Sequence, residues 1–500
     1  MKSVVFALLF IILLWYFTIR YMPEYFVDQT WAVTATYQGF YEMDKNTVDV
    51  LFFGSSAGVR GFIPQELYNN YGMTSYNLSC EQQNMVSSYY WLCEALRYQD
   101  PSVVVLESKF IFEKDKGKLQ DAWFRKAFNH MRFSSVKREA ISVSCELVNL
   151  QAEEDHRIDK QSVISWYLPI IRYHTRWEET GRAEGFQYYL KMSKIHDLKG
   201  FAPVSVRTSD EFTPIVEDET IDSAVTSEVE VEYLNKIVDL CYDEGIEVIL
   251  TYNPSTTDTV AKYNALRQYA DRRNVAFIDF NLESVLTEMS YDYNQDNEGS
   301  THVNFWGAQK LTNYIGQYLL ENNLVQERYS RQFEETRNAY EVVKADCGLR
   351  RTNDIDGYLE KLIEQKERYD VFLAVKDDAT RYLGDKTIEL LREMGLDANL
   401  RGQFQCCYLA IITGGRVAVE RAGYTLLEEA GTFSRECSYY LKSGGYHYDN
   451  ACSIMINGSE YARNGRGLNI VVYDHVNNTV VDSVVFDTWA EENTITPTSR

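Results

Sequence analysis

Short apolar runs that alternate with helical stretches constrain the fold of this chain more than any other feature. The runs are largely apolar on both faces, as in a parallel sheet that is covered by helices. The strand candidates are residues 48–53, 102–106, 246–251 and 275–279. The helical stretches lie near residues 85–97, 231–242, 259–272 and 305–322. This order predicts a three-layer α/β domain with a parallel sheet.

Two segments within this pattern carry the residues of a nucleophilic site. The first strand stops abruptly in Gly54-Ser55-Ser56. A tight turn there exposes a hydroxyl at the carboxyl edge of the sheet, where open α/β folds bind ligands. The second segment places His302 directly before the last helix. A nucleophilic serine needs an imidazole within hydrogen-bond reach, and the two can lie far apart in sequence, so the pair predicts a serine esterase or acyltransferase.

The same motifs resemble a known family. Gly-Ser-Ser after a strand, with the His-Val-Asn segment at 302–304 followed by Gly307, is similar to the SGNH/GDSL hydrolase superfamily. The closest likeness is to the membrane-anchored branch that includes the D-alanyl transfer protein of teichoic acid synthesis and polysaccharide O-acetylation proteins. The resemblance spans residues 45–325. It implies a flavodoxin-like fold, Ser56 as nucleophile and His302 as base, with no cofactor.

Besides the serine and the histidine, a catalytic triad has an acid that orients the histidine. At the position of this acid the chain departs from the family pattern. The family usually has an aspartate three residues before the histidine, where this chain has Gly299. Asp296 and Glu298 lie close by, so either carboxylate is a candidate for orienting the His302 ring. An imidazole without an orienting acid works less well as a base.

The resemblance also implies where the donors to an oxyanion lie. The first donor is expected near Ser79, in a segment that lacks the usual glycine, and the second is expected at Asn253. The missing glycine and the missing aspartate favour an alternative function, a catalytically inactive glycan-binding or assembly protein of the cell envelope. Ser56 and His302, both in their proper contexts, favour the enzyme.

An apolar run at residues 4–19 begins the chain. Lys2 precedes it, and Arg20 and Tyr21 follow, so flanking side chains can extend a slightly short membrane helix. We expect an uncleaved anchor at residues 1–22 rather than a cleaved signal peptide. The prediction is a single-pass protein of the cell membrane, with the bulk of the chain outside the cytoplasm.

Four further segments follow from changes of pattern along the chain. Residues 23–46 read as a juxtamembrane stem that leads into the hydrolase-like domain, 47–325. Within that domain the alternation breaks at residues 110–225, which predicts an inserted helical cap. At residues 326–367 charges alternate on a helical period, which indicates a linker of solvated helices.

The C-terminal region has the pattern of a mostly antiparallel β domain with one or two helices. Strand candidates at residues 405–412, 451–456, 468–473 and 479–486 are separated by turn signals such as Asn457-Gly458. We place this domain at residues 368–490, followed by a tail at 491–500.

Two segments of this region, 464–472 and 481–489, resemble the ILEI domain, which is named after interleukin-like inducer proteins. A third segment of that family, matched here by residues 375–379, stands in permuted order. The family's sugar binding implies a carbohydrate-binding role. The residues that would serve it are Arg466, Asn469, Asp487 and Trp489.

Charge and cysteine content exclude some partners. The net charge of −23 argues against nucleic acid, because neutralising phosphates requires a basic face. The nine cysteines include no CxxC pair and no metal-like cluster with histidine, so no metal site is expected. The expected partners are a cell-surface glycan or teichoic acid and, as the resembled branch implies, an integral membrane acyl-transfer protein.

Overall fold

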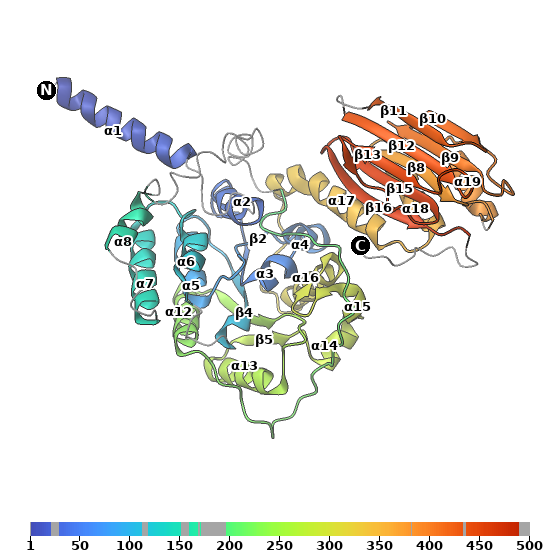
Figure 1. Cartoon of the computed structure of the whole chain (residues 1–500). Coiled ribbons are helices and arrows are strands. Elements are labelled where there is room, and N and C mark those ends of the chain that lie inside the picture. The colour runs from blue at the N-terminus through green and yellow to red at the C-terminus, as the bar shows by residue number, and fades with distance from the viewer. Residues whose placement is uncertain are drawn as a thin grey trace. The chain divides into compact units, whose positions relative to one another are not determined.

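The chain of 500 residues forms two compact units, Met1–Tyr340 and Glu341–Arg500 (Figure 1). The computed structural model describes residues 2–21, 30–112, 119–151, 160–168, 171, 197–381, 383–433 and 437–489. The division falls inside helix α17 (Arg331–Arg351), which lies with α18 (Ile355–Glu364) in the segment expected as a charged linker.

The first unit contains a five-stranded sheet in which every pairing is parallel. Its strands are β1 (Val50–Phe53), β2 (Ser75–Asn77), β3 (Val103–Glu107), β4 (Glu247–Tyr252) and β5 (Ala276–Asp279). The order β2-β1-β3-β4-β5 places the switch in winding direction between β1 and β3. Such a switch point is where open α/β sheets form a crevice at the carboxyl ends of their strands, and Ser56 follows β1 there.

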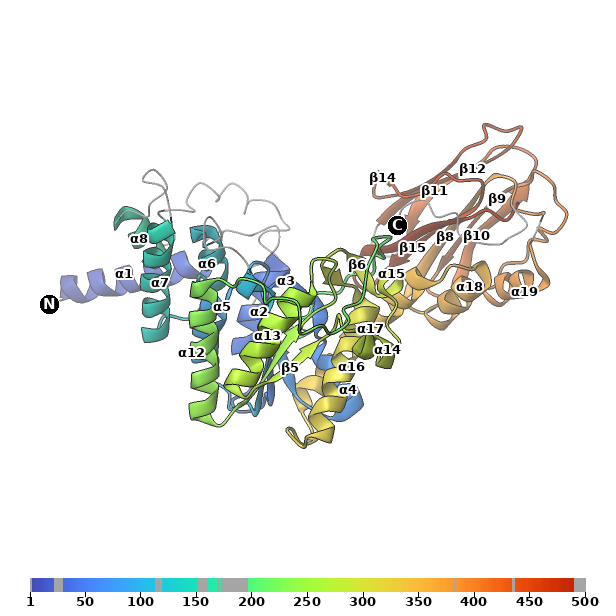
Figure 2. The same ribbon diagram turned by 90° about the horizontal axis from the view of Figure 1, so that it is seen from below.

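Helices cover both faces of this sheet (Figures 1 and 2). Helices α5 (Met85–Ala95), α12 (Glu228–Glu244) and α13 (Val260–Arg273) pack on one face, and α4 (Pro64–Tyr71) and α16 (Phe305–Glu321) lie on the other. Shorter elements complete the unit: η2 (Lys109–Phe112), α14 (Glu283–Glu288) and α15 (Tyr293–Asp296). The prediction of a parallel sheet covered by helices is confirmed.

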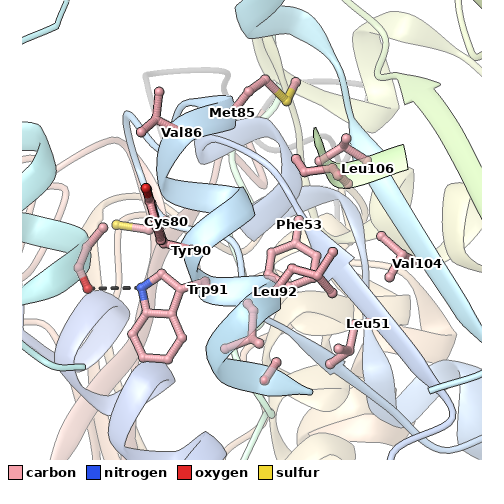
Figure 3. Close-up of a cluster of buried hydrophobic side chains, with 14 of the residues drawn as sticks. Leu51, Phe53, Cys80, Met85, Val86, Tyr90, Trp91, Leu92, Val104 and Leu106 are labelled. Atoms are coloured by element: carbon pink, nitrogen blue, oxygen red, sulfur yellow. Dashed lines mark hydrogen bonds between the residues drawn. The ribbon is translucent and has the colours of Figure 1, made fainter. Parts of the chain in front are cut away.

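The core beneath α5 holds the end of β1 in place (Figure 3). Leu51 and Phe53 of β1 belong to one buried cluster with Trp91. The Trp91 indole is fully buried, and its Nε1 donates a hydrogen bond of 3.0 Å to the carbonyl oxygen of Ala127. Burying a large aromatic ring while satisfying its N–H stabilises this packing. The strand that leads into the Gly-Ser-Ser turn is therefore rigidly supported.

Helix α2 (Thr30–Tyr41) also belongs to this core, although the sequence predicts a stem at residues 23–46. Tyr37 is fully buried and stacks on Trp91 with 4.1 Å between ring centroids, and its hydroxyl donates to Gln83. Residues 22–29 lie outside the described part of the chain. The described part of the expected stem, residues 30–46, therefore packs as part of the first unit.

The segment expected as a cap is described in part. It contains α6 (Asp121–Phe128), α7 (Ser135–Gln151) and α8 (Lys160–Tyr167). Phe124 and Phe128 of α6 are buried in the main core. Residues 113–118, 152–159, 169–170 and 172–196 of the expected cap lie outside the described residues.

The second unit is built on a nine-stranded sheet. Its strands are β8 (Tyr369–Asp377), β9 (Cys407–Thr413), β10 (Arg416–Gly423), β11 (Leu427–Phe433), β12 (Cys437–Gly445), β13 (Cys452–Ile456), β14 (Ser459–Glu460), β15 (Gly467–Asp474) and β16 (Thr479–Phe486). Every pairing except β8 with β12 is antiparallel, as the sequence predicts.

Strand β8 is central to this unit because both of its faces are buried. Val371 and Leu373 point into a core shared with α18 and α19 (Asp385–Glu393). Phe372 and Ala374 point to the opposite side, into a core shared with β12 and β13. The alternation follows from the two-residue period of a strand and makes one strand the common wall of two cores.

The apolar run expected as an anchor forms helix α1 (Lys2–Tyr21), and its side chains from Val4 to Leu14 are largely exposed. No helix in the described residues meets the combined criteria of length and apolar character for crossing a membrane.

Candidate active site

Ser56 is presented by a tight turn at the carboxyl end of β1. Gly54 ends the strand, Ser55 caps the next helix, and Ser56 is the first residue of that helix, α3 (Ser56–Gly61). A Cβ atom on Gly54 would lie 2.6 Å from the Cβ of Glu107, closer than real Cβ contacts allow. Only glycine therefore lets β1 end this close to β3.

Glu107, the last residue of β3, fixes the neighbouring serine. The Ser55 hydroxyl donates to Glu107 Oε2 at 3.0 Å, and the Lys109 amide donates to Oε1 at 3.0 Å. The Ser55 oxygen also accepts a hydrogen bond of 3.4 Å from the Ala57 amide. Burial raises the pKa of Glu107. Ser55 is thereby committed to holding the turn, which leaves the adjacent hydroxyl of Ser56 for chemistry.

The structure brings Ser56 and His302 together, as the motif pair predicts. Ser56 Oγ lies 2.7 Å from His302 Nε2, a hydrogen-bond distance. His302 lies in β7 (His302–Val303), which pairs with β6 (Asn297–Gly299) in a short hairpin. Asn304 holds this hairpin against α16, because its side chain caps the helix at Trp306 and Gly307 and donates to the carbonyl oxygen of Asn297.

Glu298 is the carboxylate closest to the other ring nitrogen. Its Oε1 lies 3.6 Å from His302 Nδ1, and the Thr301 hydroxyl lies 3.2 Å from the same nitrogen. The carboxylate also forms an ion pair with Arg60 of α3. A separation of 3.6 Å is longer than a hydrogen bond, so Glu298 lies beside the imidazole without a direct hydrogen bond to it. Arg60 and His302 therefore share one carboxylate.

Asp296, the other candidate acid, is directed elsewhere. Its Oδ2 accepts hydrogen bonds from Lys310 Nζ at 2.5 Å and from the Asp292 amide at 2.9 Å. The side chain is fully buried. These contacts assign Asp296 to packing of the loop against α16, and Glu298 is the acid that the structure places beside His302.

The two residues expected as oxyanion donors both contact the segments around α3. The Asn253 amide nitrogen donates to the carbonyl oxygen of Ala57 at 2.9 Å. The Ser79 backbone amide donates to Asn77 Oδ1 at 3.1 Å. The Ser79 hydroxyl is buried beside Gly58 and has no hydrogen-bond partner among the described residues. Asn253 therefore anchors α3. In Ser79, the side-chain hydroxyl is the group that is left to act as a donor.

The surroundings of His302 keep its ring neutral at physiological pH. Burial, followed by the positive charges of Arg60 and Lys109, lowers the pKa of His302 to about 4, against a smaller opposing effect of Glu81. A neutral imidazole can accept the Ser56 proton. These charged residues come from three separate segments and match no motif, so nothing in the sequence marks them as neighbours of His302.

The four residues expected to bind carbohydrate serve different purposes. Arg466 and Asp487 form a bidentate ion pair, in which Arg466 Nη2 lies 2.7 Å from Asp487 Oδ2. Asn469 is buried and bonds the backbone of Gly465 through both ends of its amide. The backbone amide of Trp489 donates to Asp487 Oδ1 at 3.2 Å, and Trp489 lines a cavity.

Within the described residues, no group of three or more histidine, cysteine, aspartate or glutamate side chains is arranged to hold a metal ion. No model of a known protein family matches the chain, and no curated protein matches it in sequence.

Proposed function

We propose that this chain is a serine esterase or O-acyltransferase. The observation that carries the proposal is the 2.7 Å contact between Ser56 Oγ and His302 Nε2 at the carboxyl edge of a parallel sheet. The neutral state of His302 and the rigid turn that presents Ser56 support it further. The motifs resemble those of the SGNH/GDSL superfamily, which agrees with this chemistry.

In the proposed mechanism, His302 Nε2 removes the proton from Ser56 as the serine oxygen attacks an acyl carbonyl. The resulting imidazolium is stabilised by the nearby carboxylate of Glu298. The tetrahedral intermediate collapses, the leaving alcohol takes the proton from His302, and the acyl group stays on Ser56. Water or an acceptor hydroxyl then attacks the acyl-enzyme while His302 removes its proton. Breakdown of the second tetrahedral intermediate releases the acid or the new ester, and His302 returns that proton to Ser56.

The proposed substrates are acyl groups on a cell-surface polysaccharide or teichoic acid, outside the cytoplasm. The likeness to polysaccharide O-acetylation proteins supports this substrate class. Attachment to the cell membrane through α1 is part of the proposal and rests on the exposed apolar side chains from Val4 to Leu14. An integral membrane protein that supplies acyl groups would be the partner.

The alternative is a catalytically inactive glycan-binding or assembly protein of the cell envelope. Two observations favour it: the carboxylate of Glu298 is shared with Arg60, and the Asn253 amide is occupied by Ala57. The short Ser56–His302 contact weighs more heavily, because it is the hydrogen bond that a nucleophilic serine needs with its base.

Hydrolysis of p-nitrophenyl acetate by the full chain in detergent tests the proposal. We expect turnover that Ser56→Ala and His302→Ala abolish, and that Ser142→Ala, at an exposed serine of α7, leaves unchanged. If the wild type hydrolyses none of several acyl esters faster than Ser56→Ala does, the enzyme proposal is wrong. The glycan-binding or assembly protein is then the function that the chain supports.

A further inference from the structure

The second unit contains a cavity of about 670 Å³ that neither catalytic motif accounts for. Its volume is in the range of pockets that hold small ligands. Its lining includes Arg381, Arg401, Phe404 and Trp489, together with Thr380 and Leu383. Arg466, Asn469 and Asp487 do not belong to this lining.

Two aromatic rings form one wall of the cavity. The ring centroids of Phe404 and Trp489 lie 5.6 Å apart, with the ring planes inclined by 43°. Phe404 is 56% exposed, although burial of its ring would be favourable. Trp489 is half-buried, so an exposed and a half-buried aromatic ring in the lining offer contact to an apolar or sugar-ring surface.

The charge of the lining is positive. Both charged side chains in it are arginines, and the guanidinium of Arg381 lies 4.5 Å from the centroid of the Trp489 ring. Arg401 forms an ion pair with the exposed Asp385, outside the lining. In a chain with a net charge of −23, such a pocket offers an anion a local site within a repulsive field. Planar guanidinium groups match carboxylates and phosphates in geometry.

The cavity is organised in advance by Asp378, which is buried. Its Oδ1 accepts hydrogen bonds from the amide and the hydroxyl of Thr380 at 2.7 and 2.9 Å, and its Oδ2 accepts one of 2.7 Å from the Gln405 amide. Thr488, next to Trp489, donates to the carbonyl oxygen of Ala379 at 3.0 Å. Three separate segments that line the cavity are therefore tied together without a ligand.

We propose that this cavity binds an anionic saccharide, with the sugar ring against Trp489 and Phe404 and a carboxylate or phosphate on Arg381 and Arg401. The saccharide part of this inference rests on the proposed function, and the anionic part rests on the lining. The cavity would hold an anionic cell-surface polymer on the protein while its acyl groups are processed.

Binding of the full-length Ser56→Ala protein to defined polymers tests the inference independently of catalysis. The probes are polygalacturonate, poly(ribitol phosphate), neutral dextran and inorganic phosphate, measured by isothermal titration calorimetry at two salt concentrations. We expect at least one anionic polymer to bind, more weakly at high salt, and dextran not to bind. Which polymer binds identifies the charged group as a carboxylate or a phosphate.

Substitutions in the lining locate the site. Trp489→Leu and the double change Arg381→Gln/Arg401→Gln should each weaken binding at least tenfold. The control is Arg421→Gln, since Arg421 and Arg401 have side chains that are 53% and 54% exposed and each pairs with a carboxylate. Unchanged melting temperatures would show that the variants fold. Binding of dextran as tight as that of the anionic polymers, binding of phosphate alone, no binding at all, or variants that bind like the control would each overturn the inference.

Discussion

Replacing Glu298 by glutamine tests how the proposed base is supported. The change removes a charge 3.6 Å from His302 Nδ1 and keeps the size of the side chain. Two unit charges at 3.6 Å interact by about 4–5 kcal/mol at an effective dielectric constant near 20. Arg60 opposes this effect from the other side of the carboxylate. When Arg60 offsets about half of this interaction, roughly 2 kcal/mol is left, so kcat should fall about 30-fold.

The assay is kcat for ester hydrolysis at pH 7, and Asp296→Asn is the matched control. It removes a carboxylate from the same loop, where Lys310 is the partner in place of His302. We expect this variant to melt at a lower temperature but to retain most of its kcat. A kcat for Glu298→Gln within twofold of the wild type, or an equal loss of kcat in both variants, would contradict this role of Glu298.

Three further predictions follow from the groups around the site and the core. The acidic limb of kcat/KM against pH should have a pKa of about 4, set by His302, and Arg60→Gln should move it upward because a positive neighbour is removed. Glu107→Ala should leave the Ser55 hydroxyl and the Lys109 amide unsatisfied, which lowers the free energy of unfolding by about 1–3 kcal/mol and kcat at least tenfold, as urea titration and ester hydrolysis would measure. Burial lowers the pKa of Lys199 to about 7, so the unfolded chain binds more protons above that pH; the free energy of unfolding should rise from pH 7 to pH 9, and Lys199→Met should remove this rise.

Each of these predictions has a contrary result. An acidic limb near pH 6.5, or no shift in Arg60→Gln, would mean that His302 is not the buried base described above. Glu107→Gln retains a side-chain carbonyl that can accept from Ser55, so a loss equal to that of Glu107→Ala would point to charge instead of hydrogen bonding. A free energy of unfolding that is equally pH-dependent in Lys199→Met would place the titrating group elsewhere.

The parallel sheet and the Ser56–His302 pair could be predicted because both rest on local patterns. A strand that is apolar on both faces implies a sandwiched sheet, and a Gly-Ser turn after β1 implies a hydroxyl at the edge of the sheet. Strand β2 has only three residues, Ser75–Asn77, and carries no such pattern, so it was not predicted.

The choice between Glu298 and Asp296 could not be made from sequence. It depends on the β6–β7 hairpin, whose pairing of Gly299 with His302 brings residue 298 toward the imidazole and leaves Asp296 with Lys310. The role of Glu107 could not be predicted for a related reason. Its partner Ser55 is distant in sequence. The role of an acid at the end of an apolar strand can be inferred only when the neighbouring strand is known.

The burial of α2 in the core could not be predicted from the sequence. The same holds for the strands β10 to β12. Tyr37 makes its contacts with Trp91 and Gln83, far along the chain, so its surroundings give no sign of burial. Strands β10 and β11 alternate between exposed and half-buried side chains, without the apolar face that marks a core strand.

Covalent labelling of the full chain with a fluorophosphonate, with the adduct located by peptide mass spectrometry, tests directly whether Ser56 is an activated nucleophile. We expect a single adduct on Ser56, absent in Ser56→Ala and strongly reduced in His302→Ala, because the 2.7 Å contact with His302 activates the Ser56 oxygen. No adduct, or adducts on other serines that persist in Ser56→Ala, would contradict it.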